Sequence, residues 1–181
     1  DTVDFDADVL AANGISISTV ATDVDLGADV DLTATTGALS MNSGVTLINL
    51  SGVGSNVLAA SAGDVNVGAV NDSANVAELQ IDGENVTLAA VTLDNGGASL
   101  LDVNLDGAAD GGAKTLTAGG AINVGTLTVD DQNSDDAMNF AGAVTTTGVG
   151  ITIATADTVD FDADVLAANG ISISTVATDV D

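Results

Sequence analysis

Aspartate is the side chain through which this sequence could do chemistry. The chain has 181 residues, of which 27 are acidic and one, Lys114, is basic, so its formal net charge is −26. Carboxylate oxygens are the ligands that Ca²⁺ and Mg²⁺ prefer in proteins. One hypothesis is therefore that the acids bind divalent cations. The competing hypothesis is that they form a hydrated acidic surface that aids solubility.

The acids gather in two clusters. One lies near the start of the chain, and the other is a polar stretch that we interpret as an extended corner loop. Neither cluster matches the ligand spacing of a defined calcium loop. No cofactor is required, and Ca²⁺ or another divalent cation is the ion that we expect, if any binds. The candidate metal ligands are Asp4, Asp6, Asp8, Asp23, Asp25, Asp29 and Asp31 in the first cluster and Asp130, Asp131, Asp135 and Asp136 in the second.

Other kinds of chemistry are poorly supported by the residues present. The chain has no His and no Cys, so serine and cysteine triads cannot be assembled. Paired carboxylates can hydrolyse glycosidic bonds, but sites that grip sugar also use aromatic, Arg or His side chains, and Trp and Tyr are absent. Gly119-Gly120 is not followed by the Gly-Lys-Ser/Thr of a phosphate loop. We predict that the protein is not an enzyme and has no catalytic residues.

A long internal repeat organises these residues. The first 25 residues, DTVDFDADVLAANGISISTVATDVD, return without change at 157–181, an offset of 156 residues. Such a period is typical of tandem repeats. We predict one complete repeat unit at 1–156 and the start of the next, identical unit at 157–181. On this interpretation both visible ends are interior positions of a longer molecule.

A shorter period lies inside the unit. An apolar–polar–apolar triplet, such as Val3-Asp4-Phe5 or Val65-Asn66-Val67, recurs eight times at steps of 16 to 21 residues before the first triplet returns at 159–161. Alternating side chains indicate a short β-strand, and Gly or Asn between triplets permits tight corners. The pattern predicts an all-β fold, a parallel β-helix (β-solenoid) with about eight turns of about 19–21 residues per unit.

The middle residues of the triplets predict a polar ladder on one outer face. We expect these residues to stack about 4.8 Å apart, which gives the unit a rise of about 38 Å. Asp4 would then lie over Asp25, and Asp8 over Asp29, and a cation could bridge each pair. The predicted ladder contains Asp4, Asp25, Thr46, Asn66, Thr87, Asn104, Asn123, Asn139 and Asp160.

Composition limits the partners of the chain. With one basic residue, it is a poor ligand for nucleic acid or for an anionic membrane surface. No apolar run approaches the roughly 20 residues of a membrane helix, so we expect no membrane insertion. Hydrophobic residues make up 46% of the chain, which favours a folded protein over a disordered one. Because aromatic residues are only 2%, we expect a narrow interior filled by small aliphatic side chains.

Three stretches resemble a known group of proteins. GDVNVGAV (63–70), ENVTLAAVTLD (84–94) and GGAINVGTLTVDD (119–131) are similar to repeats of large secreted bacterial β-helix proteins, of the filamentous-haemagglutinin, autotransporter and giant repeat-adhesin types. This resemblance implies a right-handed parallel β-helix, export to the cell surface and an adhesive or structural role. It carries over no functional residue.

The repeat and the resemblance together lead to two hypotheses about function. The first is a structural repeat of a long extracellular filament, sheath or stalk of the kind found in biofilms. Its partners are copies of itself, joined in tandem, stacked end to end or bundled side by side. The second is the shaft of a cell-surface adhesin whose binding tip lies outside this sequence.

Overall fold

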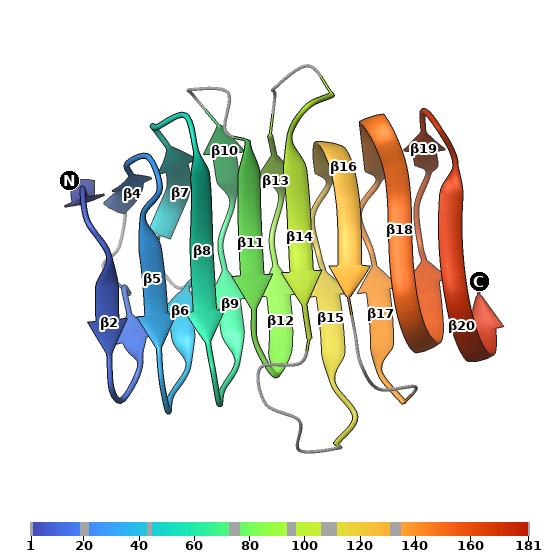
Figure 1. Ribbon diagram of the computed structural model, residues 1–181, viewed down its shortest axis with the longest axis horizontal. Coiled ribbons are helices and arrows are strands. Elements are labelled where there is room, and N and C mark those ends of the chain that lie inside the picture. The colour runs from blue at the N-terminus through green and yellow to red at the C-terminus, as the bar shows by residue number, and fades with distance from the viewer. Residues whose placement is uncertain are drawn as a thin grey trace.

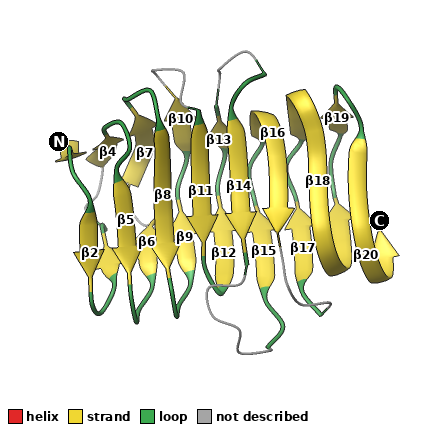
Figure 2. Ribbon diagram, in the orientation of Figure 1, coloured by secondary structure: helices red, strands yellow, loops and turns green. Residues whose placement is uncertain are grey.

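The computed structural model describes residues 2–18, 22–42, 45–72, 77–93, 97–105, 112–130 and 135–180. These residues form 20 strands and no helix, and the strand pairs among them are parallel. The chain winds around one long axis, with its N-terminus at one end of the rod and its C-terminus at the other (Figure 1). Figure 2 shows the same rod as strands joined by short loops. The predicted all-β parallel solenoid is therefore confirmed.

The strands stack in three rows, which we name A, B and C in the order in which each turn visits them. Row A contains β1 (Thr2–Phe5), β4 (Thr22–Leu26), β7 (Val45–Leu50), β10 (Val70–Asp72), β13 (Val91–Thr92), the first parts of β16 (Ile122–Asp130) and β18 (Val144–Phe161), and β19 (Val165–Ala167). Row B contains β2 (Val9–Ala11), β5 (Asp31–Ala34), β8 (Ser55–Ala60), β11 (Glu78–Asp82), β14 (Leu100–Asn104), the second part of β16, the middle of β18 and the start of β20 (Ile171–Val180). Row C contains β3 (Ile15–Ser16), β6 (Leu39–Met41), β9 (Val65–Val67), β12 (Asn85–Leu88), β15 (Thr115–Ala118), β17 (Ala137–Phe140) and the ends of β18 and β20.

The winding is right-handed, as the resemblance implies. In Figure 1 the row B strands run downward on the near side of the rod. The strands of rows C and A run upward behind them while the chain advances from left to right. This is the hand that parallel strands with crossover connections almost always adopt.

The core consists of aliphatic columns that run along the axis. In each row alternate side chains point inward, as the burial patterns of β10 in row A, β11 in row B and β9 in row C show. Each fully buried side chain of this size contributes roughly 1.5–3 kcal/mol to stability. The inward column of row B, buried and in register from turn to turn, is Leu32, Leu58, Ile81, Val103, Val129 and Ile153.

Buried polar groups fix the corner between rows A and B. The Ser99 hydroxyl donates to the carbonyl of Leu93 and accepts the amide of Gly125, both at 2.9 Å. A side chain at Gly125 would place its Cβ 2.4 Å from the Ser99 carbonyl oxygen, so only glycine fits there. The bond to Leu93 closes the corner within one turn, and the bond from Gly125 joins it to the next turn, so the two help to hold the rows in register.

The turns are longer than the sequence predicts. Along row A the turn from Thr92 to Asn123 contains much more chain than the turn from Asp4 to Asp25. The chain makes six complete turns between Asp4 and Thr145, which both lie in row A. It then passes through row B and reaches Asp160, the counterpart of Asp4, in row C. The predicted repeat unit therefore fills six turns and two further rows, not eight turns, and its rise is about 32 Å rather than about 38 Å.

The prediction of a single polar ladder is wrong. Asp4 does stack on Asp25, but Asn49, not Thr46, follows in row A. The next members belong to other rows, since Asn66 and Thr87 pair in row C and Asn104 lies in row B. The physical reason is that each turn contains three similar strands. A regular spacing along the sequence therefore selects triplets from different rows.

Candidate functional site

Asp4 and Asp25 are an acidic pair that the structure stacks as the sequence predicts. They are register partners in neighbouring strands of row A. Like charges in such positions repel each other. Asp25 is compensated on its other side, because its Oδ1 accepts a hydrogen bond of 3.1 Å from the Asn49 side-chain amide.

The same compensation recurs along the rod. An asparagine amide in one turn donates to an aspartate carboxylate in an adjacent turn, and a hydrogen bond to a charged acceptor is stronger than a neutral one. The pairs are Asn49 with Asp25 at 3.1 Å, Asn85 with Asp64 at 2.8 Å, Asn104 with Asp82 at 2.7 Å and Asn139 with Asp160 at 3.4 Å. Amide–carboxylate stacking thus lets a chain with one basic residue place many acids on its surface.

The remaining acids of the first cluster are dispersed. The prediction that Asp8 lies over Asp29 is wrong. The turn brings Asp8 to Asp31 instead, and the backbone amide of Asp31 donates to Asp8 Oδ1 at 3.0 Å. Asp29 instead accepts the backbone amide of Ser55 at 3.0 Å. Asp6 is exposed between rows A and B, and Asp23 is exposed in β4. Asp8 and Asp29 tie successive turns together, so their local role is structural.

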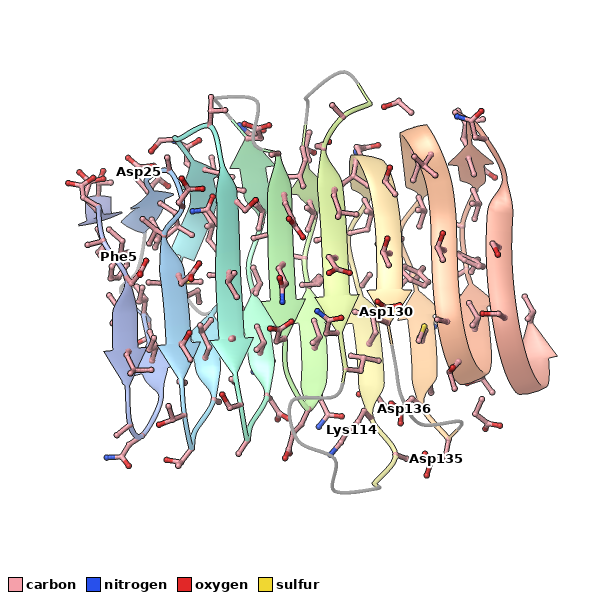
Figure 3. All side chains as sticks on the ribbon, viewed as in Figure 1. Phe5, Asp25, Lys114, Asp130, Asp135 and Asp136 are labelled. Carbon is pink, nitrogen blue, oxygen red and sulfur yellow. The ribbon has the colours of Figure 1, made fainter. Side chains whose placement is uncertain are left out.

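The second cluster is split by the fold. Asp130 is exposed at the end of β16, and Asp135 is exposed in the following turn. Asp136 is fully buried, and its Oδ1 accepts the backbone amide of Lys114 at 2.7 Å. Figure 3 shows Lys114, Asp135 and Asp136 at one edge of the rod, with Asp130 nearer its middle. Asp131 lies outside the described residues.

A different acidic cluster forms on row B, and sequence reasoning missed it. Asp102 pairs in register with Gln80 on one side and Thr128 on the other, and Asp82, Asn104 and Asp130 form the neighbouring column. The only signal that could have found this cluster is the register of row B. Of its three aspartates, only Asp130 was among the predicted ligands.

Burial and neighbouring negative charge act on the protonation of Asp102. Its Oδ1 is buried and has no hydrogen-bond partner. Burial raises the pKa of Asp102 above the ordinary aspartate value. The negative charges of Asp130 and Glu78, and then of Asp82, raise this pKa further, while a hydrogen bond with Asn104 opposes the change. The fold therefore disfavours the ionised form of Asp102.

The acidic arrangement does not assemble a chelating site within the described residues. In that part of the chain no group of three or more His, Cys, Asp or Glu side chains is placed to hold a metal ion. The surface columns can gather mobile counterions, and their amides can satisfy carboxylates directly. No helix in the same part of the chain is long and apolar enough to span a membrane.

The fold defines the chain as a β-solenoid, an architecture compatible with β-helix repeat proteins. No protein family, curated protein or solved structure matches the chain.

Proposed function

We propose that the chain is a structural repeat of a long extracellular filament, sheath or stalk built from tandem β-solenoid units. One observation carries the proposal. The segment that repeats the start of the chain continues the winding of the rod and does not form a separate domain. Its first strand, Thr158–Phe161, pairs in register with β17, and its second, β19, pairs with the start of β18.

The contacts at this junction resemble those inside the unit. Met138 and Val159 are both buried and lie in register in the core. The Asn139 amide donates to Asp160 at 3.4 Å and to Asp162 at 3.2 Å, which repeats the amide–carboxylate stacking seen elsewhere. A further unit can thus add length without a new kind of interface.

The charge of the unit suits a filament that stays separate from its neighbours. Six of the 27 acids lie in 157–181, so one unit carries 21 acids and one base, a net charge of −20. Spread over a rise of about 32 Å, this is about one charge per 1.6 Å, close to the value for double-stranded DNA. Such rods repel one another at low salt.

Lengthening the array tests this proposal. Chains with two, three and four units, secreted from a suitable host, are expected to appear in electron micrographs as rods that grow by about 32 Å per unit. A matched control replaces Val159 with Asp in each junction, which places an unpaired charge in the core and should break the rod between units. Rods whose length does not increase with unit number would reject the proposal.

An adhesin shaft is the second candidate, and one observation favours it. Leu10 and its counterpart Leu166 are 75% and 66% exposed. A recurring exposed leucine offers each unit an apolar contact for another surface. Loss of cell adhesion after Leu→Ser substitution at both positions, with rods intact, would favour this candidate.

A further inference from the structure

The two copies of the duplicated segment occupy different rows of the solenoid. Thr2–Phe5 lies in row A, whereas its copy Thr158–Phe161 lies in row C. Val9–Ala11 lies in row B, whereas its copy Val165–Ala167 lies in row A. One sequence thus appears on two sides of the same rod.

Each copy nevertheless folds in the same way locally. Thr2 pairs with Asp23 in the first copy, and Thr158 pairs with Asp179, the counterpart of Asp23, in the second. The corner glycine is left-handed in both, with φ of 118° at Gly14 and 102° at Gly170. The segment therefore keeps its own turn and is rotated as a body about the axis.

The core tolerates this rotation because the rows offer it similar inward surfaces. In row A the inward Val3 pairs with the aliphatic Val24. In row C its copy Val159 pairs with Met138, and Phe161 stacks on Phe140. The inward columns are mostly apolar, with Asn56, Asp72 and Thr146 as buried polar exceptions. A segment that alternates apolar and polar residues can therefore pack on any row.

We infer that consecutive units of a tandem array are rotated by two-thirds of a turn about the filament axis. A unit fills six turns and two of three rows, so the array regains its orientation only after three units, which span 20 turns and about 96 Å. Every outward residue is then displayed on all three sides in succession. The partner that packs against the end of each unit is the next unit of the array. The inference rests on the proposed tandem array.

Cysteine pairs in the full chain test the rotation, since the chain has no native cysteine. Rotation places Leu166 beside Thr145 in row A. A unit with a whole number of turns would instead leave Leu166 in row B, the row of its counterpart Leu10, next to Ala154. We expect the pair T145C/L166C to form a disulfide at least about tenfold faster than A154C/L166C, because cysteines whose Cα atoms are more than about 7 Å apart cannot be bridged.

The matched control is L10C/T33C, which joins the first copy to its neighbour in row B. We expect it to oxidise as fast as T145C/L166C. Faster oxidation of A154C/L166C overturns the rotation. Failure of T145C/L166C also overturns it when L10C/T33C oxidises and the circular dichroism of the variants is unchanged. Failure of the proposed function would give a different result. If the expected disulfides form in the chain but multi-unit chains form no rods, the filament proposal is rejected, while the rotated position of the second copy is retained.

Discussion

Phe161 stacks on Phe140 across one turn of the solenoid, with ring centroids 5.0 Å apart and ring planes 13° apart. Phe140 belongs to the last turns of the predicted unit, and Phe161 is the counterpart of Phe5 in the next copy. The contact therefore lies at the junction between the two units that the sequence predicts. Phe140 is 1% exposed, so the stack is also part of the core.

Replacing Phe140 with Ala is expected to lower the free energy of unfolding by about 3–5 kcal/mol, because a buried ring and its stacking partner are both lost. The control is Phe5→Ala, which removes a partly buried ring that is paired with Leu26 at the first turn. We expect a cost below about 2 kcal/mol there. Urea denaturation followed by circular dichroism measures both, and equal costs would contradict the assignment of Phe140 to the junction core.

Gly14 and Gly170 provide a second test with matched positions. Both have positive φ, so alanine is strained at either site, at a cost of about 1–2 kcal/mol. At Gly14 the added Cβ would also lie 2.8 Å from the carbonyl oxygen of Ala38 in the next turn, whereas nothing lies within 4 Å of it at Gly170. We expect Gly14→Ala to destabilise the chain more than Gly170→Ala in thermal melts. The reverse order would show that the next turn does not cover Gly14.

Asp102 predicts a specific dependence of stability on pH. Because its pKa is raised in the folded state, the native protein holds more protons than the unfolded chain between the ordinary aspartate pKa and the raised value. The Asp102 contribution to stability is therefore fully present below the ordinary pKa and is lost as pH rises through the raised value. We expect Asp102→Asn to stabilise the chain at neutral pH, by less than about 1 kcal/mol after allowance for solvent screening.

The control for this substitution is Asp82→Asn. The Asp82 carboxylate accepts hydrogen bonds from Gln80 and Asn104, so its loss is expected to destabilise the chain at neutral pH. Denaturant titrations at several pH values compare both variants with the parent. A parent and an Asp102→Asn variant with parallel pH profiles would refute the role of Asp102.

Divalent cations are expected to act between rods rather than within them. The described residues assemble no chelating group, so we expect EDTA to leave the melting temperature unchanged. Millimolar Ca²⁺ or Mg²⁺ is expected to increase lateral association, because it screens like-charged rods far better than monovalent salt does. Light scattering and calorimetry provide the two readouts. A melting temperature that falls on chelation would place a tightly bound ion inside the solenoid.

The sequence alone determined the class of fold and the direction of its side chains. The alternation of apolar and polar residues, as in Val65-Asn66-Val67, predicts which side chains point into the core, because successive side chains in a strand point to opposite faces. Scarce aromatic residues indicated the narrow interior, and the identity of 1–25 with 157–181 revealed the long repeat. These features are local, or are visible by direct comparison of letters.

Tertiary structure decided which residues stack on which. Turn length depends on corners and loops between strands, and these vary from turn to turn without changing the strand pattern. The sequence of a triplet therefore does not indicate which row its strand occupies, and the predicted ladder combined residues from all three rows. Stacking placed Asp8 beside Asp31 and gathered Asp82, Asp102 and Asp130, because parallel register is fixed by contacts between distant turns and not by spacing along the chain.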